Sequence, residues 1–503
     1  MDALISAMPQ VFQFNVLAII FAASIYGLLI GAVPGLTATM GTALLVPVTF
    51  FLDPVPAIGA IVAATSMAIF AGDIPGALLR IPGTPASAAY TDEAYKMRQK
   101  GQVELALGVN VVCSAIGGLV GVAILIIAAP QIARFSLGFS SYEYFWLALL
   151  GLSCAVLVSS GSAIKGVIAL CLGLMLSTIG IDVVMGVRRF TFGDTELIGG
   201  VSIIPVLIGV FAIAEILRKV ANPTTLPPVP PIRPGAMVKG VSKIIWQYKG
   251  GVARSSLMGT VIGALPGAGA DIAAWIAFAI SKKFSRTPEK FGSGHVEGIV
   301  SASSANNAAL SGAYIPSLVF GIPGDTITAI LIGVLLMKGI TPGPMVFIMD
   351  APLVNAIFLV FIVANLIMVP LGFLAVLGSR HILSISQSIL FPVILLFCVI
   401  GAFSTNNTLF DVWVMLVVGL IAFVLEENDF PTAPAILALI LGPLIEENFM
   451  QSMIKSDGGM APFFDRPIGG TLGVVTLSIW ALIIGFALWN VIGKRRAPAA
   501  TDS

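Results

Sequence analysis

Long apolar stretches follow one another along almost the whole chain, separated by shorter polar segments. A helix needs about 20 predominantly apolar residues to cross a bilayer. The apolar runs are continuous rather than alternating, which is typical of membrane-spanning helices and not of a membrane β-barrel. With shorter and interrupted segments included, the pattern predicts roughly 12 spans in an all-α polytopic membrane protein. The clearest stretches are 105–129, 142–160, 197–217, 352–376, 408–425 and 470–493.

Composition agrees with this pattern and excludes several classes of protein. Of the 503 residues, 57% are hydrophobic and 10% are charged, whereas a soluble protein carries roughly 25% charged residues. The net charge of +1 gives no reason to expect a nucleic acid partner. The four cysteines stand singly and there are two histidines, so neither a zinc site nor a disulfide framework is indicated. No grouping of residues suggests catalysis, and we expect neither enzyme activity nor a cofactor.

A proline-rich segment divides the chain near its middle and separates two similar halves. Six of the fifteen residues in 221–235 are proline, a composition typical of a semi-rigid linker. The spacing Gly-x3-Gly-x2-Pro-Gly occurs in each half, and Ile-Pro-x5-Ile-Pro-Gly follows it in both. Two motifs that recur in the same order indicate an internal repeat. The first motif begins at Gly27 and Gly259, and the second at Ile74 and Ile315.

Basic residues are placed oppositely in the two halves. Short cytoplasmic loops are enriched in Lys and Arg. In the first half these residues follow the second motif, at Lys96, Arg98 and Lys100. In the second half they follow the first motif, between 282 and 290. The two halves are therefore predicted to cross the membrane in opposite directions, as in inverted-repeat transporters.

The same charge pattern predicts the location of the termini. Residues 1–79 contain no Lys or Arg, so the start lacks the basic region of a signal peptide and the first apolar stretch is expected to remain as a span. We expect a periplasmic N-terminus, with the basic linker and the C-terminal tail in the cytoplasm. The predicted organisation is a first inverted repeat over 1–220, a cytoplasmic linker over 221–242, a second inverted repeat over 243–450, and a periplasmic loop, last helix and basic tail over 451–503.

Helices interrupted by proline and glycine are the expected binding elements of an inverted-repeat carrier. A break exposes N–H groups with about half a positive charge, which can bind a carboxylate without a buried lysine. Nearby hydroxyls, amides and unwound carbonyls can bind carboxylate oxygens or a cation. The substrate-binding candidates are Pro34, Gly35, Gly83, Thr84, Pro85, Ser87, Pro266, Gly267, Asn306, Asn307, Gly324, Thr326 and Thr328. The candidates for a coupling ion are Asp73, Asp271, Asp325, Ser303 and Ser304.

Purely structural roles are open for the same residues. Gly27, Gly31 and Gly35 could form a face on which two helices pack closely. Serine and threonine in membrane helices often bond only to the backbone of their own helix. Acids at membrane depth are functional candidates, but each acid beside a break could instead cap a helix at the water interface.

Taken together, the motifs resemble the large membrane subunit of the tripartite tricarboxylate transporter family over nearly the whole chain. The resemblance rests on GAVPGLTATMG at 31–41, RIPGTPASAA at 80–89, GALPGAGAD at 263–271, SANNAALSGAYIPSLVFGIPGD at 304–325 and KGITPGP at 338–344. It implies a secondary carrier in the bacterial inner membrane that imports di- or tricarboxylates together with Na⁺ or H⁺. The implied partners are a small four-helix membrane subunit and a periplasmic solute-binding protein.

One departure from the family concerns the segment before the asparagine pair. The family usually has Pro-Glu there, and this chain has Ala302 and Ser303. The missing acid bears on the coupling ion and on the anion accepted, so the resemblance does not specify citrate. A carboxylate channel or an exchanger without gradient coupling is the alternative, and a homodimer of the large subunit is left open.

Overall fold

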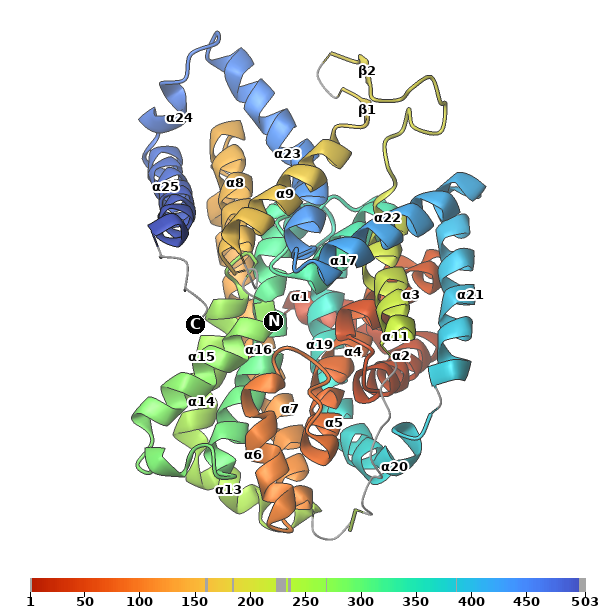
Figure 1. The fold of residues 1–503 in the computed structure, drawn as a ribbon, viewed down its shortest axis with the longest axis vertical. Helices are drawn as coiled ribbons and strands as arrows, with labels where there is room; N and C mark the ends of the chain where they lie inside the picture. The colour runs from red at the N-terminus through yellow and green to blue at the C-terminus, as the bar shows by residue number, and fades with distance from the viewer. Residues whose placement is uncertain are drawn as a thin grey trace, which may run out of the picture. The chain divides into compact units, whose positions relative to one another are not determined.

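The computed structural model is built almost entirely from helices (Figure 1). It describes residues 2–158, 162–182, 185–222, 232–233, 237–267, 269–385 and 387–496. Within these residues, eight helices are long and apolar enough to cross a membrane, and four shorter apolar helices accompany them. The prediction of an all-α polytopic membrane protein is confirmed.

The chain forms two compact units, and each unit takes residues from both sides of the linker. The first comprises Met1–Leu137 and Ser202–Val424, and the second comprises Gly138–Val201 and Leu425–Ser503. Most of the predicted proline-rich linker and the end of the basic tail (497–503) lie outside the described residues. The boundaries predicted for the two repeats stay a prediction.

In the first unit, α7 of the first half lies against α16 of the second half (Figure 1). The glycines of α7 allow this approach, because Gly117 and Gly121 face the backbone of α16 at Ser304 and Ala308. The helices of this unit are α1 (Asp2–Val11), α2 (Phe14–Ala32), α3 (Ala38–Phe50), α4 (Pro54–Ala71), α5 (Asp73–Leu79), α6 (Ala88–Gln99), α7 (Val103–Ser136), α10 (Ile203–Ile208), the π-helix η1 (Gly209–Ile213), α11 (Ala214–Ala221), α13 (Val241–Gln247), α14 (Lys249–Gly263), α15 (Gly269–Phe284), the 3₁₀ helix η2 (Pro288–Lys290), α16 (Val296–Phe320), α17 (Thr326–Met337), α18 (Val346–Met349), α19 (Ala351–Leu377), α20 (Ser379–Ile382), α21 (Gln387–Asn406) and α22 (Leu409–Glu427).

The second unit is a separate group of helices with an aromatic core. Its core is formed by Tyr142, Trp146 and Phe463, and the Trp146 indole donates a hydrogen bond to the Phe463 carbonyl at 3.0 Å. The two strands pair antiparallel, and Arg189 binds the carboxylate of Glu446 through two nitrogens, at 2.6 and 3.0 Å. The elements are α8 (Ser141–Val158), α9 (Ala163–Ser177), β1 (Gly180–Ile181), β2 (Arg188–Arg189), α23 (Ala433–Lys455), α24 (Pro462–Asp465) and α25 (Pro467–Arg496).

Equivalent helix pairs in the two halves pack in the same way, which confirms the internal repeat. In each pair, two glycines of the first Pro-Gly helix contact the backbone of two alanines on the following long helix, so that a Cβ at either glycine would collide with main-chain atoms. Small residues allow such close helix contacts in membranes. The pairs are Gly27 with Ala64 and Gly31 with Ala68 between α2 and α4, and Gly259 with Ala305 and Gly263 with Ala309 between α14 and α16.

All four Pro-Gly motifs interrupt helices, as expected. The breaks after α2 and α14 contain Gly35 and Gly267 with φ of +92° and +81°, a conformation that glycine adopts at little cost. The breaks before α6 and α17 follow helices that end at left-handed residues, Arg80 and Gly321. Proline removes a backbone donor at each break, so the chain leaves the helix and begins a new one a few residues later.

Candidate functional site

All four breaks meet at one cavity of about 50 Å³ in the first unit. Each break supplies two or three of the residues that line the cavity, so the two halves of the chain contribute equally to its wall. Ile69 of α4 and Asn306 of α16 complete the lining. The residues from the breaks are Thr37, Ala38 and Thr39, then Thr84 and Pro85, then Ala270 and Asp271, and finally Asp325, Thr326 and Ile327.

The N-termini of α3 and α17 are held in place by capping side chains. The Met40 N–H donates to the Thr37 hydroxyl at 3.0 Å. At α17, the Thr328 N–H donates to the Asp325 carboxylate at 2.8 Å, while the Asp325 N–H donates to the Thr328 hydroxyl at 2.9 Å. This is a capping box, which fixes where the helix begins. Two helix N-termini, one from each half, therefore open at the cavity.

Hydrogen bonds also connect the two halves across the cavity. The hydroxyls of Thr39 and Thr326 lie 3.2 Å apart, so the breaks before α3 and α17 touch. On the other side, Asp271 of α15 accepts the Ala86 N–H at 3.1 Å. The Trp275 indole donates to the Pro85 carbonyl at 3.1 Å. The cavity is thus bordered by contacts between parts of the chain that are far apart in sequence.

The electrostatic character of the cavity is mixed. Helix N-termini, threonine hydroxyls and the Asn306 amide offer donors to an anion. Asp271 and Asp325 add carboxylates, and none of the described residues that line the cavity is Lys, Arg or His. Asp271 is exposed and Asp325 is half-buried, whereas Asn306 is buried, so the cavity lies nearest the surface of the unit on the side of the acids. The arrangement suits an anion that binds together with cations.

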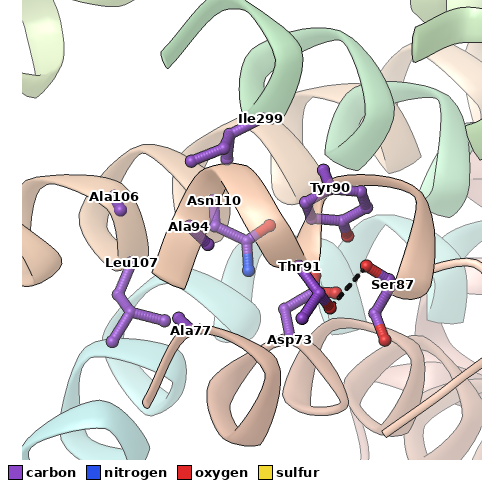
Figure 2. A pocket seen from close by; sticks show the side chains of 10 residues that line it. All are labelled: Asp73, Ala77, Ser87, Tyr90, Thr91, Ala94, Ala106, Leu107, Asn110 and Ile299. Atoms are coloured by element: carbon purple, nitrogen blue, oxygen red, sulfur yellow. Dashed lines mark hydrogen bonds between the residues drawn. The ribbon is translucent and has the colours of Figure 1, made fainter. Parts of the chain in front are cut away.

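A second, smaller cavity lies beside Asp73 (Figure 2). Its volume is about 10 Å³, and Asp73, Ser87, Tyr90, Thr91 and Asn110 supply its polar lining. Asp73 is 4% exposed. The Thr91 hydroxyl donates to the Ser87 carbonyl at 2.8 Å. Asp73 therefore lines the smaller cavity and not the larger one.

The predicted site residues fall into three groups. Six of them line the larger cavity: Thr84, Pro85, Asp271, Asn306, Asp325 and Thr326. Two line the smaller cavity: Asp73 and Ser87. The others line neither: Pro34, Gly35, Gly83, Pro266, Gly267, Gly324, Asn307, Thr328, Ser303 and Ser304.

Residues of the third group have visible structural contacts. The Gly83 N–H donates to the Gly72 carbonyl at 3.0 Å, and the Gly267 N–H donates to the Gly324 carbonyl at 2.7 Å, so these glycines shape the breaks. The hydroxyls of Ser303 and Ser304 donate to carbonyls one turn earlier in α16, at 2.6 and 2.8 Å. This is the common backbone bonding of serine in membrane helices.

Sequence reasoning missed several polar residues that line the two cavities. Thr37 and Thr39 follow the Pro34-Gly35 pair closely, as Thr326 follows the Pro323-Gly324 pair, so the presence of hydroxyl residues just after a Pro-Gly pair was the available signal. Tyr90 and Asn110 line the smaller cavity. Asn110 is a single amide within an apolar stretch, and such a residue at membrane depth needs a partner.

Comparison with known proteins identifies the family. Residues 17–437 match the family described as "Tripartite tricarboxylate transporter TctA family". The chain belongs to this family. As a TctA family protein it is a multi-pass membrane component of a tripartite tricarboxylate transporter, and the resemblance inferred from the motifs is confirmed.

Two relatives of this TctA family chain come from Agrobacterium vitis. One, named "Uncharacterized 52.8 kDa protein in TAR-I ttuC' 3'region", is 34% identical over 467 residues, which cover 91% of each chain. The other, named "Uncharacterized protein in TAR-II ttuC' 3'region", is 36% identical over 214 residues, or 42% of this chain and 88% of the relative. No solved structure matches the chain.

Proposed function

We propose that this chain is the transmembrane carrier subunit of a binding-protein-dependent secondary transporter, which imports a di- or tricarboxylate by cation symport. The observation that supports this most directly is the meeting of four broken helices, two from each half, at one cavity. Such a meeting of discontinuous helices is the binding arrangement of inverted-repeat carriers.

The donors of the cavity favour a carboxylate as substrate. Thr37, Thr39 and Thr326 present hydroxyls beside the N-termini of α3 and α17. Hydroxyls and helix N-termini bind carboxylate oxygens by hydrogen bonds and by the partial positive charge of the helix end. Donors come from both halves, so both halves can contribute to binding a carboxylate group.

The acids of the cavity favour coupling to a cation. An anion entering beside Asp271 and Asp325 meets like charge, and no basic side chain lines the cavity to offset it. Like charges at short range repel by several kcal/mol at the intermediate dielectric of a protein. Binding a cation, either Na⁺ or H⁺, to these carboxylates removes the repulsion. Anion and cation should therefore bind together, which is the requirement for symport.

Family membership supports the remaining parts of the proposal. The partners would be a small four-helix membrane subunit and a periplasmic solute-binding protein that delivers the carboxylate. The complex would lie in the bacterial inner membrane, with the N-terminus of this chain in the periplasm and the C-terminus in the cytoplasm, as the distribution of Lys and Arg predicts.

Uptake into proteoliposomes tests the proposed function. The vesicles contain this chain, its small subunit and its binding protein, and a panel of radiolabelled carboxylates is offered with an imposed Na⁺ or proton gradient. We expect one carboxylate to accumulate above its outside concentration under one of the gradients. Equilibration without accumulation would instead indicate a channel or exchanger, and absence of flux for every acid would contradict carboxylate transport.

A matched pair of threonine variants assigns the activity to the cavity. Thr39→Val removes a hydroxyl that lines the cavity, and Thr49→Val removes a buried hydroxyl on the same helix that bonds to the Val46 carbonyl. One hydrogen bond to a charged group contributes about 1.5–3 kcal/mol. Thr39→Val should therefore raise the KM for the carboxylate roughly tenfold or more, whereas Thr49→Val should not.

A further inference from the structure

Asp73 is a buried carboxylate inside a membrane-spanning segment, and its polar neighbours are the Tyr90 hydroxyl and the Asn110 amide. It begins α5, within the apolar segment Pro54–Leu79. The residue is almost fully buried, and neither carboxyl oxygen has a hydrogen-bond partner. An ionised group in this condition is costly, and ionisable residues at membrane depth generally serve a function. The charge of Asp73 therefore calls for a ligand.

The cavity beside Asp73 has the size of one small ion and contains further polar atoms without partners. A volume of about 10 Å³ is close to the minimum that one water-sized sphere needs. The Tyr90 hydroxyl and both polar atoms of the Asn110 amide form no hydrogen bond. Figure 2 shows the Tyr90 hydroxyl and the Asn110 amide directed toward Asp73. None of the residues lining the cavity is basic.

We propose that this cavity is a Na⁺ site whose ligands come from Asp73, Tyr90 and Asn110. Na⁺ is a hard cation and takes oxygen ligands. The carboxylate, the phenol and the amide carbonyl all supply them. The Asn110 amide can turn its oxygen inward, because neither of its ends forms a hydrogen bond of close geometry.

The charge and the oxygen atoms of the cavity suit a bound Na⁺. The Asp73 carboxylate, the Tyr90 hydroxyl and the Asn110 carbonyl place several oxygens around one small space. A bound cation interacts with these oxygens at once. It also offsets the negative charge of Asp73, which none of the residues that line the cavity compensates.

The Na⁺ site is joined to the larger cavity by one turn, and this part of the inference rests on the proposed function. Thr84 lines the larger cavity and Ser87 lines the Na⁺ cavity. The Thr84 N–H donates to the Ser87 hydroxyl, and the Ser87 N–H donates to the Thr84 hydroxyl, each at 3.1 Å. Tyr90 also lies close to Asn306 of the larger cavity. Na⁺ bound at Asp73 should therefore order the Thr84–Ser87 turn and favour carboxylate binding.

The test uses Na⁺ alone, without carboxylate or partner subunits. Thermal unfolding of the purified full chain is followed in detergent while NaCl replaces choline chloride at constant ionic strength and pH. We expect saturable stabilisation by Na⁺ in the wild type and a much smaller stabilisation in Asp73→Asn, in which only the acids of the larger cavity remain to bind the cation. The control is Asp92→Asn, which removes an exposed acid that pairs with Arg80 and should keep the Na⁺ response.

A second signature appears without Na⁺. Asp73→Asn removes a buried uncompensated charge, so this variant should unfold at or above the wild-type temperature in choline alone. Tyr90→Phe and Asn110→Ala should each raise the Na⁺ concentration of half-stabilisation at least tenfold. If Asp73→Asn does not yield folded protein, the Tyr90→Phe and Asn110→Ala variants are used to test the site instead.

Several results would overturn the Na⁺ site. An unchanged Na⁺ response in Asp73→Asn, or in both Tyr90→Phe and Asn110→Ala, would place Na⁺ elsewhere. Stabilisation of the wild type by lower pH but not by Na⁺ would assign a proton to Asp73. This measurement does not involve carboxylate uptake, so the Na⁺ site and the proposed function can fail separately. If the proteoliposomes transport no carboxylate but Na⁺ still stabilises the chain through Asp73, the proposed function is refuted and the Na⁺ site is retained.

Discussion

Glu93→Gln should destabilise the first unit, because the Glu93 carboxylate ties α6 to a loop of the second half. The side chain is almost fully buried, at 1% exposed. Its Oε1 accepts the N–H of Gly292, and its Oε2 accepts those of Gly294 and His295, at 2.6 and 2.7 Å. Lys96 of the same helix donates to the Gly292 carbonyl. The loop just before α16 is therefore held to α6 by the Glu93 carboxylate, which accepts three hydrogen bonds, and by Lys96, which donates one.

The size of the effect follows from the three donors. An amide has one acceptor oxygen, so glutamine can keep at most the pair from Gly294 and His295, and it turns an NH₂ group toward the Gly292 N–H. A hydrogen bond to a charged group contributes about 1.5–3 kcal/mol, and the two that remain become weaker once the charge is gone. We expect Glu93→Gln to lower the free energy of unfolding by about 2–4 kcal/mol.

Denaturant titration of the purified chain in detergent measures this difference. Asp92→Asn is the matched control, since it removes the neighbouring acid, whose ion pair with Arg80 is exposed and contributes about 0–1 kcal/mol. Equal unfolding free energies for Glu93→Gln and the wild type would refute the reasoning. So would equal losses in Glu93→Gln and Asp92→Asn, because the argument depends on the burial of Glu93 and its three donors.

Three further variants test other contacts. Gly31→Val should abolish recovery of monodisperse protein, because a Cβ there meets the backbone of α4, whereas Gly250→Ala, where a Cβ meets nothing, should elute normally from a size-exclusion column. Arg189→Lys should cost the second unit about 1–2 kcal/mol in denaturant titration, since lysine cannot form both hydrogen bonds to Glu446. Lys338→Met should lower the unfolding free energy by about 1–2 kcal/mol, because it removes two hydrogen bonds to the carbonyls of residues 50 and 52. An unfolding free energy equal to that of the wild type, in Arg189→Lys or in Lys338→Met, would contradict the role given to that residue.

The repeat and the positions of the breaks could be predicted because their causes are local. Proline lacks a backbone donor wherever it occurs, and glycine permits close packing or a left-handed turn. Gly267 thus allows the left-handed turn at its own position, and Gly31 allows close packing against α4, which follows soon after it in the sequence. The same local logic found Thr84 and Thr326, which come directly after breaks and line the larger cavity.

Which polar groups share a cavity could not be predicted, because that depends on contacts between distant segments. Thr39 and Thr326 touch although 287 positions separate them. Asp73 was a candidate on its own, but nothing local shows that α6 and α7 bring Tyr90 and Asn110 to it. Ser303 and Ser304 show the converse, since their hydroxyls could have faced a cavity and instead bond within α16.

The equal division of the larger cavity between the two halves bears on how such a protein could arise. Either half alone supplies only two of the four breaks, so a half-length ancestor would have had no complete cavity. It would have gained one only by associating with a second copy of itself, with each copy contributing two breaks. Duplication and fusion of that gene would then have joined an existing pair, and the two copies could afterwards diverge. Asp73 illustrates such divergence, because the equivalent position in the second half is Tyr314.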